Sequence, residues 1–290
     1  MIKLDGRATS QSIRQEIAAE VKKLQEKGGK TPHLVAVLVG SNGASQTYVK
    51  AKVRDCEEVG FVSDVVRLSE TITEAELLQE VQRLNADAAV DGFIVQLPLP
   101  RHIDEQKVLM AIDPAKDVDG FHPENLGKMA LNLPSYLPAT PMGILDLMDR
   151  YNIETGGKHC VVVGRSHIVG LPISILMGRN GYPGNATVTL THSRTTNLPE
   201  LLRSADIIIA ALGKPHFVTA DMVKEGAVLI DVGTTRVVDK SKKSGHRLVG
   251  DIDYEKAASK AAYITPVPGG VGPMTRVSLL KNTLLAARHK

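Results

Sequence analysis

The sequence predicts an α/β fold with two domains and a cleft between them. Short apolar runs of strand length alternate with segments of helical period from one end of the chain to the other. Such alternation is typical of right-handed βαβ units and a mostly parallel sheet. A Pro-rich stretch at residues 133–141 interrupts the alternation, and 290 residues are enough for two cores of ordinary size.

The first series of elements covers the N-terminal half. Thr73 begins its third helix, with Glu76 three residues later in capping-box register. We expect helices over residues 13–24, 44–59 and 73–84, and strands over residues 34–39, 62–68 and 91–95.

The second series follows the Pro-rich stretch and completes a doubly wound set. Pro141 is expected at the first position of a helix that runs to Tyr151. The sequence thus predicts a first α/β domain of residues 1–140 plus 272–290 and a Rossmann-type domain of residues 141–271. The other expected elements are strands at 159–163, 187–190, 207–210 and 228–231, and helices at 169–177, 198–202 and 273–288.

Composition restricts the class of protein. Apolar residues make up 43% and charged residues 23%, an ordinary globular balance. The net charge of +3 is small and its 35 basic residues are scattered, so we expect no nucleic-acid partner. Cys56 and Cys160 are isolated in the sequence, which favours neither a disulfide framework nor a metal site. Without a signal peptide or an apolar membrane segment, we expect a cytoplasmic protein with no membrane partner.

The segment at residues 161–170 is an apolar strand followed by a glycine turn and a helix. Gly164 permits the tight turn, Gly170 permits close packing of the helix, and the free N–H groups suit a pyrophosphate. Ser166 replaces the middle glycine of the usual G-x-G-x-x-G fingerprint, so the alternative is an ordinary βα turn of an open sheet.

The end of the next strand favours NADP over NAD. NAD enzymes place an acidic residue there to bind the ribose 2′-hydroxyl, but this chain has Ser193 and Arg194, with Arg165 in the first turn. Cationic and hydroxyl donors suit a 2′-phosphate. Alternatively, Arg194 is an exposed loop residue and Ser193 a helix cap.

Tyr48 and Lys52 lie four residues apart, so their side chains share one face of the helix predicted at residues 44–59. Such a pair is commonly a solvated surface pair. The same spacing occurs in short-chain dehydrogenases, but there the pair follows the dinucleotide turn within one domain, and here it precedes that turn.

Three further segments of the chain carry candidate ligand-binding residues. Gln96 follows a buried strand and precedes Pro98, which places it at the carboxyl edge where α/β sheets bind ligands. Asp119 lies in the loop 116–120, where Asp is also common for turn formation alone. The glycines of residues 266–273 let backbone approach a ligand closely.

Taken in order, these segments resemble the methylenetetrahydrofolate dehydrogenase/methenyltetrahydrofolate cyclohydrolase (FolD) family over nearly the whole chain. PVPGGVGPMT together with VQLPLP and KDVDG is far more specific than either glycine motif alone. The matching segments are residues 39–45 with Tyr48 and Lys52, 95–100, 116–120, 164–170 and 266–275.

The resemblance implies a bifunctional enzyme of one-carbon metabolism, with a catalytic N-terminal domain and a dinucleotide-binding C-terminal domain. It would oxidise 5,10-methylenetetrahydrofolate to the 5,10-methenyl form with NADP, then hydrolyse the product to 10-formyltetrahydrofolate. It also implies a homodimer paired through the dinucleotide domain.

The same resemblance assigns roles to individual residues. Lys52 is catalytic, assisted by Tyr48 and Gln96, and Asp119 holds the pterin. Other residues expected at the folate are Leu97, Pro268, Gly269 and Gly270, and those expected at NADP are Gly164, Arg165, Ser166, Ile168, Val169, Ser193, Arg194, Gly213 and Thr234.

The chain departs from the family pattern at two places. Ala139 stands where many relatives carry Cys, and Thr234 and Thr235 replace the frequent Ile-Asn, which bears on cofactor preference. Two other interpretations are a dehydrogenase without cyclohydrolase activity and a non-catalytic folate- or nucleotide-binding regulator. The intact set of Tyr48, Lys52 and Gln96 argues against both.

Overall fold

The computed structural model describes residues 1–242 and 245–288, and the chain forms two compact units. We call Gln11–Ala139 with Arg276–Lys290 the three-stranded unit, although residues 289 and 290 lie outside the described part. Met1–Ser10 with Thr140–Thr275 form the six-stranded unit. Each unit is described by itself.

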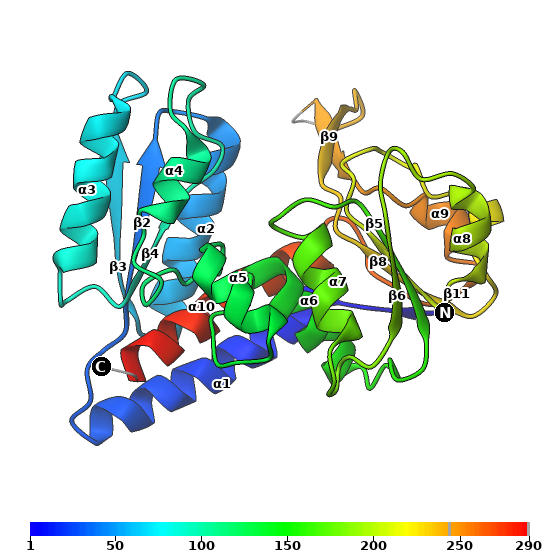
Figure 1. Cartoon of the computed structure of the whole chain (residues 1–290), viewed down its shortest axis with the longest axis horizontal. Helices are drawn as coiled ribbons and strands as arrows, with labels where there is room; N and C mark the ends of the chain where they lie inside the picture. The colour runs from blue at the N-terminus through cyan, green and yellow to red at the C-terminus, as the bar shows by residue number, and fades with distance from the viewer. Residues whose placement is uncertain (243–244, 289–290) are drawn as a thin grey trace. The chain divides into compact units, whose positions relative to one another are not determined.

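The three-stranded unit is built on a parallel sheet in the order β3-β2-β4. β2 (His33–Val39) is central, β3 (Val62–Leu68) and β4 (Gly92–Val95) flank it, and all three are labelled in Figure 1. Six consecutive residues of β2 are buried, as expected for a strand covered on both faces.

Helices surround this sheet and complete its core. α3 (Glu74–Ala86) and α4 (Glu105–Met110) share a hydrophobic cluster with β2 and β4, and α2 (Gly43–Val59) contacts β2 and β3. The remaining helices with residues in this unit are α1 (Gly6–Glu26), α5 (Pro123–Ala130) and α10 (Val271–Arg288).

The six-stranded unit has an all-parallel sheet in the order β1-β11-β8-β7-β5-β6. After β5 the chain adds β6 on one side and then β7 on the other, so the strand order reverses at β5. In doubly wound sheets the ligand crevice lies at the carboxyl ends of the two strands beside this reversal. The strands are β1 (Ile2–Lys3), β5 (His159–Val163), β6 (Thr187–Thr191), β7 (Ile207–Ala210), β8 (Ala227–Asp231) and β11 (Ala261–Ile264).

Short helices and a hairpin complete this unit. α7 contacts β5 and β6, whereas residues of α8 and α9 belong to the core cluster that also contains β7 and β8. The elements are α6 (Ala139–Arg150), α7 (Gly170–Gly178), α8 (Leu198–Ser204), the 3₁₀ helix η1 (Ala220–Met222), α9 (Tyr254–Ala257), and the antiparallel pair β9 (Thr235–Val238) and β10 (His246–Val249).

The α/β class, the Rossmann-type sheet and the positions of the predicted strands and helices are confirmed, except that α1 begins at Gly6 and not at residue 13. The predicted capping box is also present, because the Thr73 hydroxyl accepts from Glu76 N at 3.2 Å and Glu76 Oε2 accepts from Thr73 N at 2.9 Å. This reciprocal pair satisfies two backbone N–H groups that the helix leaves free.

The compact units differ from the predicted domains mainly at the N-terminus. Residues 1–10, predicted to belong to the first domain, lie in the six-stranded unit. β1 pairs with β11, Leu4 N donates to Ile264 O at 2.8 Å, and Leu4 is fully buried. Burial of this side chain and the added strand fix the N-terminus to the larger sheet.

Smaller differences concern the helices that Pro141 and Pro273 were expected to begin. α6 begins at Ala139 and α10 at Val271, so each proline occupies the third helical residue. Proline is tolerated there because the first-turn N–H groups have no intrahelical partner. The sequence pattern also missed β1, α4, α5, η1, β9, β10, α9 and β11.

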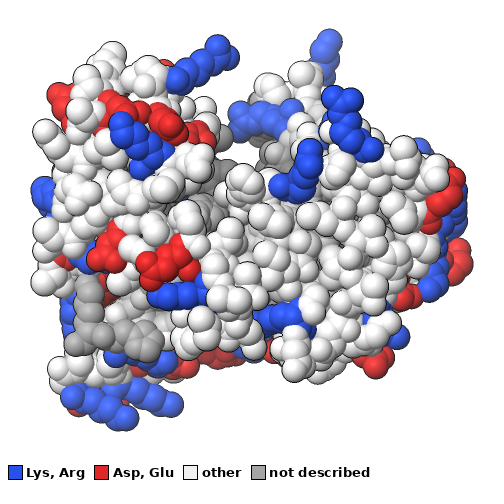
Figure 2. All heavy atoms as spheres, in the orientation of Figure 1, with Lys and Arg blue, Asp and Glu red and all other residues white. Residues whose placement is uncertain are grey.

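The surface carries charges of both signs. On the face shown in Figure 2, acidic and basic side chains are interspersed among uncharged ones. Within the described ranges 1–242 and 245–288, no helix is long and apolar enough to cross a membrane.

The capping box at the start of α3 gives a stability test. Replacing Thr73 with Ala should lower the free energy of unfolding by about 1 kcal/mol, because Glu76 N loses its acceptor. Chemical denaturation measures the change. Thr196→Ala is the matched control, since Thr196 is exposed and outside any helix or strand. Equal effects of the two substitutions would contradict the capping role.

Candidate active site

Lys52 and Gln96 meet in the three-stranded unit. Lys52 lies on α2, Gln96 follows β4, and Lys52 Nζ donates to Gln96 Oε1 at 3.2 Å. Among the described residues this is the only hydrogen bond of the Lys52 amine, and no carboxylate oxygen lies within 4 Å of it. The structure therefore brings together two of the residues that the resemblance singled out.

Gln96 is held in one orientation. Its backbone N–H donates to Val37 O at 2.9 Å, which continues the pairing of β4 with β2 by one residue. Its Nε2 donates to Leu97 O at 2.8 Å. A flipped amide would place donor against donor at Lys52 and acceptor against acceptor at Leu97, so the contacts define which end faces the lysine.

Asp119 reaches the same site through a segment anchored beside β4. Phe93 N donates to Lys116 O at 3.1 Å, and Asp117 forms a parallel bridge with Phe93. Tyr136 donates its hydroxyl to Ala115 O at 3.1 Å. The loop before Asp119 thus behaves as a short extra strand at the edge of β4.

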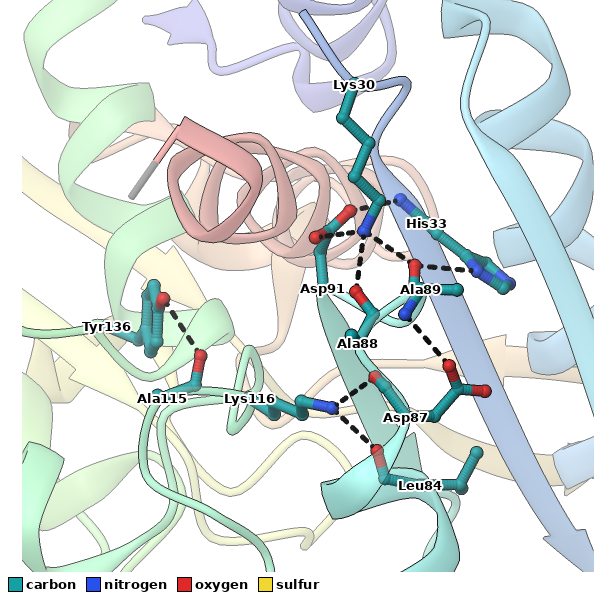
Figure 3. A network of polar contacts seen from close by, with 10 residues as sticks. All are labelled: Lys30, His33, Leu84, Asp87, Ala88, Ala89, Asp91, Ala115, Lys116 and Tyr136. Atoms are coloured by element: carbon teal, nitrogen blue, oxygen red, sulfur yellow. Dashed lines mark hydrogen bonds and ion pairs between the residues drawn. The ribbon is translucent and has the colours of Figure 1, made fainter. Parts of the chain in front are cut away.

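Lysines fix both this segment and the loop that precedes β4, as Figure 3 shows. The buried Lys116 donates from Nζ to Leu84 O at 2.8 Å and Asp87 O at 2.6 Å, at the carboxyl end of α3. Lys30 donates to Ala89 O at 2.7 Å and pairs with the buried Asp91 at 2.6 Å. Cations at a helix carboxyl end are stabilised by its free carbonyl groups.

Hydrogen bonds of Asp117 and Asn282 hold the segment before Asp119 to α5 and α10. Asp117 accepts from His122 N at 2.7 Å and from Asn125 Nδ2 at 3.0 Å, which ties it to the start of α5. Asn282 of α10 donates from Nδ2 to Val118 O at 2.8 Å and to Leu137 O at 2.9 Å. Asp119 therefore lies in a loop that is hydrogen-bonded to β4 and the end of α3 on one side and to α5 and α10 on the other.

Burial shifts the ionisation of both charged groups of the site toward neutrality. Desolvation lowers the pKa of Lys52 below its usual value of 10.5, and the charge of Asp119 opposes this only in part. Desolvation likewise raises the pKa of Asp119, against the effect of Lys52. A lysine with a lowered pKa carries more of the free amine at neutral pH, and the free amine is the form that accepts a proton.

An ion pair that the sequence does not predict lies beside Lys52. Arg276 of α10 pairs with Asp55 of α2, which is 2% exposed and lies three residues after Lys52 on the same helix. The positive charge of Arg276 further lowers the pKa of Lys52. The two partners are 221 residues apart in sequence, so no local pattern could reveal the pair.

Tyr48 and Leu97 lie close to these groups along the chain. Tyr48 is 45% exposed on α2, one turn before Lys52, so its ring is accessible to a ligand. Leu97 is half-buried and packs against the core beneath β4.

The predicted dinucleotide turn follows β5 in the six-stranded unit. Gly164 has φ +113°, and a Cβ there would lie 2.2 Å from Ala211 O, so only glycine fits. Ser166 Oγ accepts from Val169 N at 3.2 Å and Gly170 N at 3.4 Å, which orders the start of α7.

Free backbone donors remain in this turn. In the part of the chain that the structure describes, the N–H groups of residues 165–168 donate no hydrogen bond, and this stretch, including Ile168, is exposed. Consecutive free N–H groups before a helix form a site for an anion such as a pyrophosphate.

The end of β6 presents positive charge and no acid. Ser193 and Arg194 are exposed in the turn after β6, and Arg165 is exposed in the turn after β5, the strand paired with β6. Neither arginine forms an ion pair within the described residues. His192 orders the turn, because its Nδ1 accepts from Arg194 N at 3.1 Å.

The other predicted residues occupy three loops of the same unit. Gly213 follows β7 and Thr234 follows β8, and both are exposed. Gly269 and Gly270 are buried, and Gly269 O accepts from Arg7 N at 3.1 Å, whereas Pro268 is exposed. These glycines therefore pack against residues of the N-terminus of the chain. Among the described residues, no group of three or more His, Cys, Asp or Glu is arranged to hold a metal ion.

Comparison with known proteins places the chain in a family. The model of the tetrahydrofolate dehydrogenase/cyclohydrolase catalytic domain matches residues 4–119, and the model of the NAD(P)-binding domain of that family matches residues 138–290. The bifunctional protein FolD of Cytophaga hutchinsonii is 65% identical over 287 residues, which cover 99% of both chains. This chain belongs to the tetrahydrofolate dehydrogenase/cyclohydrolase family.

Solved structures of the family have the same fold. The bifunctional enzyme FolD of Campylobacter jejuni matches with a TM-score of 0.93 and 45% identity, covering 100% of this chain and 99% of that one. The Trypanosoma brucei enzyme, complexed with NADP cofactor and an inhibitor, matches with a TM-score of 0.94 and 40% identity, covering 100% and 98%.

A double-mutant cycle tests the ion pair beside Lys52 in this tetrahydrofolate dehydrogenase/cyclohydrolase. Asp55→Ala should lower the free energy of unfolding by about 3 kcal/mol, because removing one partner of a buried pair leaves the other charge uncompensated.

The double variant Asp55→Ala with Arg276→Met should lose less than the sum of the single losses, by about 1–3 kcal/mol. Chemical denaturation measures all three variants, with Lys50→Met as control, because Lys50 is exposed on the same helix and pairs with neither residue. Strict additivity of the single effects would show that the pair contributes nothing.

Proposed function

We propose that this chain oxidises 5,10-methylenetetrahydrofolate to 5,10-methenyltetrahydrofolate with NADP and then hydrolyses that product to 10-formyltetrahydrofolate. The observation that carries the proposal is the contact of the Lys52 amine with the Gln96 amide oxygen at 3.2 Å, in a chain of this family. The amine has a lowered pKa and one defined hydrogen-bond partner.

The first reaction needs alignment more than acid–base chemistry. A hydride leaves the methylene carbon of the folate, and NADP accepts it when bound. No proton has to move in this step, so the task of the protein is to hold the two reactants in register. The residues proposed for the folate are Tyr48, Lys52, Gln96, Leu97, Asp119, Pro268, Gly269 and Gly270.

The second reaction requires a base. Water adds its oxygen to the cationic methenyl carbon, and the proton that it releases passes to the free amine of Lys52. The bond from this carbon to N5 then breaks, the new hydroxyl group gives up its proton and N5 takes one up, so the carbon remains on N10 as the formyl group and the proton on Lys52 is the one released overall. A neutral amine also avoids placing a second positive charge beside the cationic substrate.

Gln96 and Asp119 support this chemistry in different ways. The Gln96 amide holds the amine without adding a charge, because its carbonyl oxygen accepts from Lys52 in either protonation state. The Asp119 carboxyl offers oxygen acceptors for N–H groups of the pterin, and the exposed Tyr48 ring offers a surface for it.

We place NADP at the turns that follow β5, β6, β7 and β8. The free N–H groups of residues 165–168 suit the pyrophosphate, and Ser193, Arg194 and Arg165 suit the 2′-phosphate of NADP. Other residues proposed for the dinucleotide are Gly164, Ser166, Ile168, Val169, Gly213 and Thr234. We also propose a cytoplasmic enzyme that forms a homodimer through the six-stranded unit, on the basis of the family resemblance.

The direct assay is NADP-dependent formation of the methenyl absorbance band from methylenetetrahydrofolate, followed by its decay. Both phases are expected from the purified chain. Formation without enzyme-accelerated decay would indicate a dehydrogenase alone, and the absence of both phases would contradict the proposal.

Replacing Lys52 with Met should reduce hydrolysis of methenyltetrahydrofolate by about a hundred- to ten-thousand-fold, the range that acid–base catalysis supplies. Part of the dehydrogenase activity should survive, since hydride transfer needs no base. The rate is followed by loss of the methenyl absorbance. Lys50→Met is the control, because Lys50 is exposed on the same helix. Undiminished hydrolysis by a folded Lys52→Met enzyme would exclude Lys52 as the base.

Removing Arg194 should weaken the preference for NADP. Arg194→Ala is expected to raise the Michaelis constant for NADP about ten- to a hundred-fold and to leave that for NAD nearly unchanged, through loss of charge-assisted hydrogen bonds. Initial rates at varied cofactor concentration measure both constants, with Arg203→Ala on α8 as control. Equal use of NADP and NAD by the unmodified enzyme would refute the assignment.

A further inference from the structure

Two buried carboxylates lie beneath the loops at the carboxyl edge of the six-stranded sheet. Asp231 ends β8 and is 3% exposed, and Asp251 follows β10 and is fully buried. Asp251 N donates to Asp231 Oδ1 at 2.9 Å, so the two residues are neighbours. The reactions described above use neither of them.

Asp251 binds the loop that follows β7. Its Oδ2 accepts from Leu212 N at 2.7 Å and from Gly213 N at 2.9 Å. A single carboxylate oxygen thus fixes two consecutive N–H groups, and Gly213 is one of the residues proposed for the dinucleotide. The loop lies beside the turn after β5, because Ala211 N donates to Val163 O at 2.8 Å.

Asp231 binds the loop that follows its own strand. Its Oδ1 accepts from Gly233 N at 2.9 Å and its Oδ2 accepts from Ile252 N at 2.8 Å. Gly233 immediately precedes Thr234, another residue proposed for the dinucleotide. Asp231 N also donates to the Thr265 hydroxyl at 2.7 Å, at the start of the loop 266–270.

The backbone wraps these carboxylates so closely that side chains are excluded. A Cβ at Gly250 would lie 1.9 Å from Asp231 Oδ2. Asp251 Oδ1 is buried without a hydrogen-bond partner among the described residues. Burial first, and the charge of Asp251 in addition, raises the pKa of Asp231 to about 7. Burying two neighbouring carboxylates, one of them with an unbonded oxygen, costs free energy. We therefore expect the two groups to have a function that offsets this cost.

We propose that Asp251, supported by Asp231, is a positioning residue for the dinucleotide that fixes the loops carrying Gly213 and Thr234, which follow the neighbouring strands β7 and β8. The inference rests on the proposed function. Because Asp251 is fully buried, it acts through these loops and not by touching the cofactor. Fixed loops bind a ligand more tightly, since less chain entropy is lost on binding.

The test compares the two activities of Asp251 variants, because hydrolysis of methenyltetrahydrofolate needs no dinucleotide whereas the oxidation does. Asp251→Ala should raise the Michaelis constant for NADP at least about tenfold, the effect of losing hydrogen bonds to a charged acceptor. Hydrolysis and the Michaelis constant for the folate should stay within about twofold of the parent. Asp251→Asn should restore most of the NADP affinity, because one amide oxygen can accept both N–H groups.

Asp206→Ala is the matched control for stability. Asp206 lies at the opposite end of β7, where its carboxylate accepts from His159 N at 2.9 Å. This variant should lose stability without any change in the Michaelis constant for NADP. An unchanged NADP constant in Asp251→Ala, or a parallel loss of both activities, would overturn the inference.

A measurement on the unmodified chain covers the case in which Asp251→Ala does not fold. Hydrogen exchange without cofactor should show Leu212 and Gly213 N–H protected, whereas exchange as fast as in free loops would overturn the inference. Failure of the proposed function itself would appear differently, as absence of NADP binding by the parent enzyme.

Discussion

In the described part of the chain, a single amide oxygen binds the Lys52 amine in a poorly solvated place. Water would offer this group several acceptors, so its charged form is disfavoured there and its pKa falls. The groups around Lys52 can be understood from the need to keep this amine neutral. Gln96 is the one acceptor among the described residues, Asp119 stays beyond 4 Å, and Arg276 adds a second positive charge that further disfavours protonation of Lys52.

The surrounding fold makes that arrangement rigid. Gln96 continues the ladder between β4 and β2, and the segment before Asp119 is bonded to β4, to the end of α3 and to α10. Lys116 is thus a structural lysine whose amine donates to two carbonyl groups, whereas Lys52 in the same unit has one partner among the residues that the structure describes. The same residue type is structural at position 116 and is proposed as the base at position 52, because the two amines have different acceptors.

Much of this could be predicted from the sequence, where the signals are local. Periodicity located the long helices and buried strands, the Thr73 capping box fixed the start of α3, and the motif resemblance identified Lys52, Gln96 and Asp119. Long-range features left no such trace. The two-residue strand β1 is too short to show a pattern, Asp55 and Arg276 are distant in the chain, and nothing near Asp251 indicates that it binds the loop after β7.

Burial makes Lys52 a weaker base than a free lysine, so a larger fraction of its amine is unprotonated at a given pH. Nuclear magnetic resonance of isotope-labelled lysine side chains, with the Lys52 signal assigned through Lys52→Met, can follow its titration directly in the folded chain. We expect a midpoint clearly below the usual 10.5. A midpoint at or above 10.5, as a solvated or fully ion-paired lysine would show, would contradict it.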